Sequence, residues 1–149
     1  MFKKLFIPSE DSDLTHTALL VARLWFGLTM LFNHGFDKLA HFNDIVGTFP
    51  DPLRFGHEAS LILVILAEVV GSLLLTVGLM TRLAAAVLII DMFVAFLMVH
   101  SAAFTAAGGG ELAFLYLAGF IVLAIAGAGL FSLDEVVFAR KLNGRTEKA

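Results

Sequence analysis

The chain of 149 residues contains no cysteine, which excludes disulfides, thiolate metal sites, iron–sulfur clusters and dithiol redox chemistry. Charged residues make up only 15% of it, and the formal net charge of −3 excludes a basic surface for nucleic acid. Its three prolines and thirteen glycines fall mainly at the ends or on the faces of expected helices, so we expect no linker and no second domain. Because the chain has no cysteine, any electrons that the protein transfers must travel on a bound cofactor.

Hydrophobic residues are abundant instead, at 59% of the chain, and the mean hydropathy is +0.91. Such values are typical of an integral membrane protein, whose first partner is the lipid bilayer. A helix needs about 20 apolar residues to cross the bilayer core, and four stretches of the chain come close to this length. The sequence predicts an all-α fold, a four-helix transmembrane bundle in one domain, with spans at about 17–36, 59–79, 83–99 and 112–130.

The connections between these spans predict the orientation of the bundle. Residues 37–58 form a long polar loop, 80–82 form a tight hairpin, and 131–149 form a tail. Ser132 and Glu135 have the spacing of a capping box, which predicts a short interfacial helix in this tail. Most lysines and arginines lie in the termini and the hairpin, so we expect both termini to be cytoplasmic, in a cell inner membrane, and loop 37–58 to be outside.

Helical spacing places the polar residues of the first two spans on one stripe of each helix. The stripes consist of Arg23, Gly27, Met30, His34 and Lys38 in the first span and of Glu68, Gly71, Ser72 and Thr76 in the second. Small and polar residues let membrane helices approach each other closely. Both stripes should therefore face the interior of the bundle.

Three charged side chains, Arg23, Glu68 and Asp91, lie within the expected spans, and we expect them to share a buried cluster. One interpretation is structural: the cluster neutralises itself and sets the register of the helices. The other is functional, because one arginine against two acids leaves a surplus acid for proton transfer beside a redox or transported species.

Histidines and an acid gather at the expected outer ends of the helices, as His34, His57, His100 and Glu111. Imidazole and carboxylate groups can bind a metal, and His34 and His100 have a similar expected depth for a bridging haem. No two of them lie four residues apart on one helix, however, so we predict neither metal nor haem. We expect His34, Lys38 and Glu111 to converge at the outer mouth of the bundle as a cofactor-binding group.

Five pieces of the sequence, in this order and spacing, carry a resemblance. They are RLWFGLTMLFNHGFDKL at 23–39, Glu68 with Gly71, GLMTR at 78–82, GGGEL at 108–112 and GAGLFSLD at 127–134. Together they resemble the DoxX family over most of residues 17–134. The recurrent polar positions of that family are matched by Arg23, His34, Lys38, Glu68 and Glu111, whereas Asp91 is an addition in this chain.

The resemblance implies a four-helix membrane protein, and some relatives are linked to quinone-dependent thiosulfate oxidation or to membrane-associated oxidative-stress complexes. One implied function is a quinone-linked redox subunit, in which Arg23 and Glu68 handle protons while His34 and Lys38 contact a quinone carbonyl. A second is a non-catalytic partner or scaffold subunit of a larger membrane or redox complex, and a homo-oligomer is compatible with both. A small-solute or proton carrier is a further alternative, although four short helices without an inverted repeat leave little room for alternating access.

Overall fold

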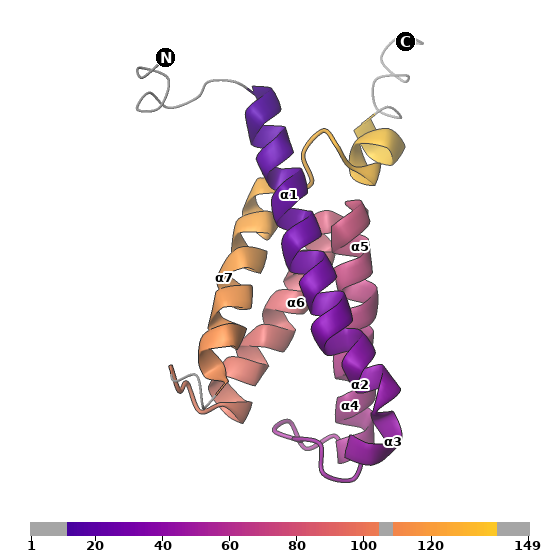
Figure 1. Ribbon diagram of the computed structural model, residues 1–149, viewed down its shortest axis with the longest axis vertical. Helices are drawn as coiled ribbons and strands as arrows, with labels where there is room; N and C mark the ends of the chain where they lie inside the picture. The colour runs from indigo at the N-terminus through magenta and orange to yellow at the C-terminus, as the bar shows by residue number, and fades with distance from the viewer. Residues whose placement is uncertain (1–11, 105–108, 140–149) are drawn as a thin grey trace.

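The computed structural model describes residues 12–104 and 109–139, and within these ranges all regular structure is helical. Four long, continuous helical segments, which we call rods, form the bundle (Figure 1). Three of them contain a π-helical turn, inside the segment or at its end. The first rod comprises α1 (Ser12–Met30), η2 (Leu31–Gly35) and α2 (Phe36–Ala40), and the second comprises α4 (His57–Leu66), η3 (Ala67–Gly71) and α5 (Ser72–Val77). The third comprises α6 (Thr81–Val94) and η4 (Ala95–Val99), and the fourth is α7 (Gly110–Ala126). Two short elements complete the described structure, α3 (Phe42–Ile45) and η6 (Glu135–Ala139).

Three of the rods, Asp13–Ala40, His57–Val77 and Thr81–Val99, are long and apolar enough to cross a membrane. The fourth, Gly110–Ala126, is apolar but has only 17 residues. It ends four residues before the expected boundary because Gly127 adopts a φ of 81°, a conformation that a helix cannot contain. The predicted all-α membrane bundle is confirmed.

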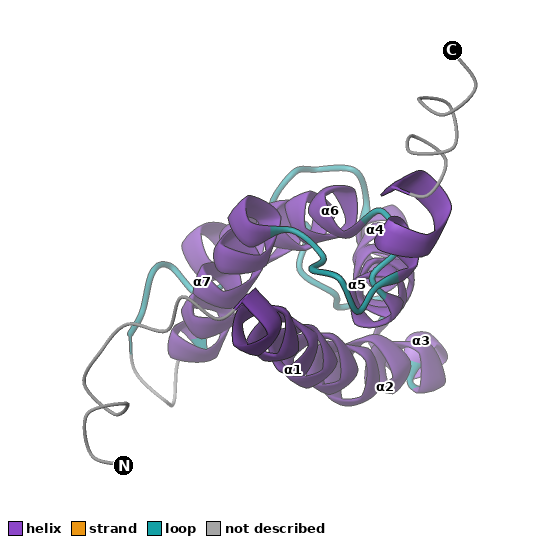
Figure 2. Cartoon of the chain, turned by 90° about the horizontal axis from the view of Figure 1, so that it is seen from above, coloured by secondary structure: helices purple, strands orange, loops and turns teal. Residues whose placement is uncertain are grey.

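The rods surround one apolar core, and two ends of the bundle can be distinguished. We call the end that carries Ser12 and η6 the tail end and the opposite end, which carries α3, the loop end. Seen along the bundle, α1 lies between α7 and α5, and it packs against both (Figure 2). The core between them is formed by Met30, Leu75, Leu88, Phe120 and Leu123, all almost completely buried.

Glycines on the predicted interior stripe let the first rod approach the second. A Cβ atom added at Gly35 would lie 3.1 Å from the backbone of both Glu68 and Val69, and one at Gly27 would collide with the Thr76 hydroxyl. Both contacts are too close for a larger residue to enter without displacing the neighbouring helix. Gly35 is therefore held at the depth of Glu68, near the middle of the second rod.

The segment that follows α7 is attached to the hairpin between the second and third rods. Both Asp134 carboxylate oxygens accept hydrogen bonds at the start of α6. The donors are the backbone N–H groups of Met80 (2.6 Å), which precedes the helix, and of Thr81 (2.9 Å), its first residue. A carboxylate at this position satisfies N–H groups that have no partner within their own helix. The predicted capping contact is also present, since the Glu135 backbone N–H donates to the Ser132 hydroxyl over 3.3 Å.

Candidate functional site: a cavity at the loop end

A cavity of about 540 Å³ opens where the rods separate toward the loop end. The third rod packs against α5 and η3, whereas α4 diverges from it in the part of the chain that the structure describes. The space between them is bounded by apolar side chains of the second, third and fourth rods and of the loop at 49–55, while the first rod contributes only polar side chains. Its polar lining consists of His34, Lys38, Ser60, Glu68, Asp91, His100 and Tyr116.

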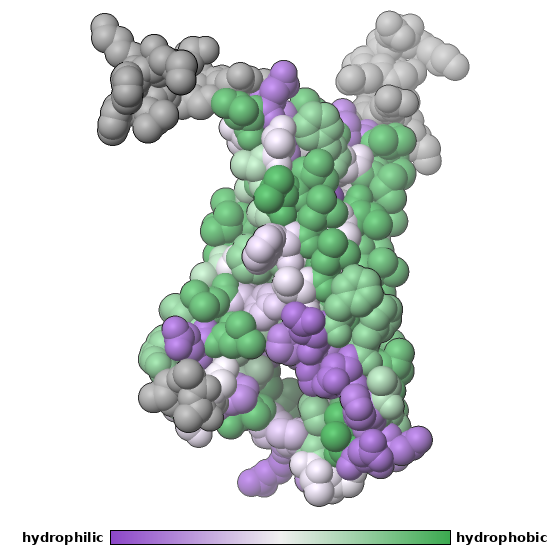
Figure 3. All heavy atoms as spheres, in the orientation of Figure 1, coloured by the Kyte–Doolittle hydropathy of each residue, from purple (hydrophilic) through white to green (hydrophobic). Residues whose placement is uncertain are grey.

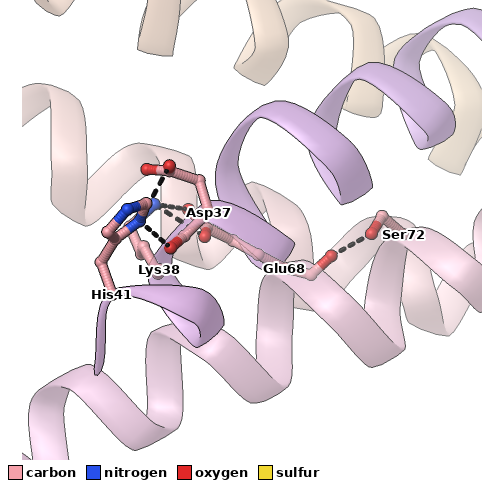
Figure 4. A network of polar contacts seen from close by, with 5 residues as sticks. All are labelled: Asp37, Lys38, His41, Glu68 and Ser72. Carbon is pink, nitrogen blue, oxygen red and sulfur yellow. Dashed lines mark hydrogen bonds and ion pairs between the residues drawn. The ribbon is translucent and has the colours of Figure 1, made fainter. Parts of the chain in front are cut away.

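The centre of the polar lining is an ion pair between Lys38 and Glu68 (Figure 4). Lys38 Nζ lies 2.7 Å from Glu68 Oε2 and 2.8 Å from Oε1, so the ammonium group contacts both carboxylate oxygens. The Glu68 side chain is only 3% exposed and that of Lys38 20%. Removing two charges from water is costly, and their attraction offsets this cost only while both partners are present.

Two π-helical turns bring the ion pair together. His34 belongs to η2 and Glu68 to η3, and the two turns pack directly against each other. A π turn contains one residue more than an α turn, which shifts the direction of the side chains that follow, and such turns are frequent at functional sites. Lys38 lies one turn beyond η2, where its side chain reaches back to Glu68.

Asp91 of α6 adds a second acid to the same wall of the cavity. Its Oδ2 atom is buried and makes no hydrogen bond to any described residue. The carboxyl group lies close enough to Glu68 and Lys38 for the three charges to interact. The site therefore combines one lysine with two acids, and one oxygen of the surplus acid has no hydrogen-bond partner among the described residues.

His34 and Tyr116 form the neighbouring part of the lining. Their rings meet edge to face, with centroids 5.4 Å apart and an interplanar angle of 88°. Sequence reasoning missed Tyr116, although it is the only tyrosine of the chain and interrupts an otherwise apolar span. Its phenol and the imidazole bring hydrogen-bonding groups to the side of the cavity formed by the first and fourth rods.

The expectation that Arg23 shares a site with Glu68 and Asp91 is wrong. Arg23 is completely buried at the tail end, where its guanidinium donates hydrogen bonds to the carbonyl oxygens of Thr76 (3.3 Å) and Phe131. It lies beside Gly78, ten residues and therefore about 15 Å along the helix from Glu68. That distance exceeds the reach of the side chain, and Lys38 is the partner of Glu68 instead.

The expected group of His34, Lys38 and Glu111 is only partly assembled. His34 and Lys38 both line the cavity, whereas Glu111 is exposed in the first turn of α7 and does not line it. Of the other histidines that we expected at the outer helix ends, His100 reaches the cavity and His57 is exposed in the first turn of α4. No three histidine or acidic side chains among residues 12–104 and 109–139 are grouped to hold a metal ion.

Asp51 organises the loop that bounds the cavity at the loop end. Its carboxylate accepts hydrogen bonds from the Ser60 hydroxyl (2.7 Å) and from the backbone N–H groups of Gly56 (2.8 Å) and Phe55 (2.9 Å). The Ser60 hydrogen bond, followed by those from the backbone, holds the pKa of Asp51 below its ordinary value. The loop is thus tied to the first turn of α4 by a charged group.

This arrangement predicts that Asp51 stabilises the protein only while it is ionised. Because its pKa is lower in the folded than in the unfolded state, the stabilisation is complete above about pH 4 and is lost as pH falls through the folded-state pKa. Asp51→Asn should therefore lower the melting temperature at pH 7 but have little effect well below pH 4. Asp44→Asn, at an exposed acid of α3, is the control and should show no such pH dependence. A difference between wild type and Asp51→Asn that persists at low pH would contradict this role.

Comparison with known proteins identifies the family. The family model described as DoxX matches residues 18–101, which is more than half of the chain. The chain belongs to the DoxX family. A relative from Haemophilus influenzae, described as an uncharacterized protein, is 42% identical over 78 residues, which cover 49% of this chain and 58% of the relative. No solved structure matches the chain. The part matched by the DoxX model includes Lys38, Glu68 and Asp91 but not Tyr116.

Proposed function

We propose that this DoxX protein is a quinone-binding membrane subunit of a redox system. The observation that carries the proposal is the cavity of about 540 Å³, which is mainly apolar and contains the Lys38–Glu68 ion pair on its wall. Small-molecule sites typically have this size and combine an apolar lining with a few convergent polar groups. A cavity inside a membrane bundle favours a ligand that is itself dissolved in the membrane.

The polar lining fits the chemistry of a quinone headgroup. When bound, a quinone supplies an electron-accepting ring whose two carbonyl oxygens accept hydrogen bonds and take up protons on reduction. Lys38 and Tyr116 bring hydrogen-bond donors to the cavity, and His34 brings a ring nitrogen that can donate. Asp91 also lines the cavity, and its carboxyl group can hold a proton or accept a hydrogen bond from a ligand hydroxyl.

The cavity also has a route for an apolar chain. Leu63 of α4 and Val87 and Ile90 of α6 line it, and all three side chains are exposed rather than buried in the core. The opening between these two helices therefore faces lipid. A ligand with a polar head and a long hydrocarbon tail can place the head at Lys38 and leave the tail in the bilayer, which a small water-soluble substrate does not require.

We assign the electron donor to another component of the membrane system. The chain has no cysteine that could hold an iron–sulfur cluster or act as a dithiol. The residues of this chain bind and orient the ligand, exclude water from it with apolar walls, and exchange protons at Asp91 and His34. These roles are those of a subunit rather than of a complete oxidoreductase.

Quinone binding to purified protein in lipid nanodiscs tests the proposal. Ala67→Phe should fill part of the cavity and weaken binding of a short-chain ubiquinone or menaquinone by about tenfold or more, because Ala67 lines the site. Val70→Phe is the matched control, since Val70 belongs to the same π turn but is exposed outside the cavity. Melting temperatures of both variants show whether the fold is retained. Equal affinity in the two variants, or no saturable quinone binding to wild type, would overturn the proposal.

A further inference from the structure

The first rod carries exposed polar residues on the side that faces away from the bundle. Asn33, Asp37 and His41 are all exposed and follow one another at intervals of four residues. In the space-filling view, polar atoms continue from the loop end up to the middle of the molecule, between apolar surfaces on both sides (Figure 3). We call these three residues the polar stripe.

The depth of the polar stripe makes it unusual for a surface that faces lipid. Gly35 packs against Glu68 and Val69 near the middle of His57–Val77, a helix long and apolar enough to cross a membrane, so Asn33, two residues away, lies close to the level of the middle of that helix. The Asn33 amide makes no hydrogen bond to any described residue. A polar group without a partner in hydrocarbon is costly, and such residues normally face another helix.

We propose that a second copy of this chain covers the polar stripe, so that the protein forms a two-fold symmetric dimer through its first rod. A dimer of this kind brings the same residues of both copies together across the axis. The carboxamide of asparagine has both a donor and an acceptor, so two Asn33 side chains can hydrogen-bond to each other. Paired polar side chains of this type hold membrane helices together.

The charges of the polar stripe also match those of an identical stripe. His41 Nδ1 lies 3.2 Å from Asp37 Oδ1 of the same chain, while His41 Nε2 has no partner among the described residues (Figure 4). The acid and the imidazole are both well exposed, at 62% and 58% of their side chains. In a dimer, Nε2 of each histidine, in the doubly protonated imidazolium form, can donate to Asp37 of the other copy. The acid of each chain then pairs with the base of the other chain, whereas a different partner would have to supply an acid and a base of its own.

The same side of the first rod offers apolar contact area toward the tail end. Trp25, eight residues before Asn33 and therefore on nearly the same face of the helix, is 70% exposed there. A shallow groove continues along this side and is lined by Val21, Leu24, Trp25, Leu28 and Thr29. The dimer contact can therefore extend along the first rod from Val21 to His41, and it is independent of the cavity and of what binds there.

Disulfide formation in native membranes tests the proximity of the two copies. The chain has no cysteine, so Thr29→Cys introduces one thiol a single turn from Asn33. Ile90→Cys is the control, because Ile90 is 65% exposed on α6, away from the polar stripe. Under mild oxidation Thr29→Cys should form covalent dimers and Ile90→Cys should not. Equal crosslinking of the two variants would overturn the proposal.

The role of the amide is tested by energy transfer between labelled copies as they are diluted in liposomes. Asn33→Leu should raise the dissociation constant of the dimer by about tenfold, while Asn43→Leu, at an exposed asparagine of α3, should leave it unchanged. Because leucine is apolar and of similar size, Asn33→Leu should still fold in the membrane. A wild-type protein that is monomeric at all dilutions, or dimerisation that survives Asn33→Leu unchanged, would overturn the proposal and leave the polar stripe to a different membrane protein.

Discussion

Lys38→Met should lower the free energy of unfolding by about 3–5 kcal/mol, because it leaves the Glu68 carboxylate buried without its cation. Glu68 is almost inaccessible to water, and Lys38 is the donor that contacts both of its oxygens. Asp91 cannot substitute, since it has the same charge as Glu68. Denaturant unfolding in one mild detergent measures the loss, and Arg54→Met, at an exposed loop position, is the control.

A double variant separates the cost of an unpaired charge from the value of the pair. Lys38→Met combined with Glu68→Leu replaces both ions by apolar side chains of similar size, which is often neutral or stabilising in a protein interior. We expect the double variant to recover most of the lost stability while losing quinone affinity. A double variant as unstable as Lys38→Met alone would show that the lysine acts through packing rather than through charge.

Arg23→Leu should lower the free energy of unfolding by about 3 kcal/mol and loosen the segment that follows α7. The guanidinium is the group that joins the carbonyl oxygens of Thr76 and Phe131, and a buried acceptor that loses its donor costs about 1–3 kcal/mol. Unfolding experiments measure the first effect. The second is measured by the rate at which a thiol reagent modifies Ser132→Cys, at a position only 9% exposed in the folded protein.

Arg82→Leu is the matched control for Arg23→Leu. Arg82 is also at the tail end and also donates to a backbone carbonyl, that of Ile125 over 3.4 Å, but its side chain is exposed. Its removal should change stability by no more than about 0.5 kcal/mol and leave the labelling of Ser132→Cys unchanged. Equal behaviour of the two arginine variants would contradict the assignment of Arg23 as the link between the rods and the following segment.

Much of the candidate site could be predicted from local patterns. Helical periodicity put Lys38 and Glu68 on the interior stripes of their helices, and both line the cavity wall. Asp91 was expected among the buried acids, and it lies beside them. These predictions succeed because the direction of a side chain on a helix depends only on its position within that helix. Tyr116 had no comparable signal, since its own span shows no polar stripe.

The sequence by itself determined that the chain is an all-α membrane protein, because about 20 consecutive apolar residues can satisfy their backbone groups in a bilayer only as a helix. It also determined which polar residues of the first two spans face inward. Only the tertiary structure decided that Lys38, and not Arg23, neutralises Glu68. That choice depends on how far one helix is shifted along another, and the shift is set by the contact of Gly35 with the backbone at Glu68 and by the two π turns beside it. One residue of shift moves a side chain by about 1.5 Å along the helix axis. The ion pair therefore depends on the relative position of two helices, which the sequence of either helix alone does not determine.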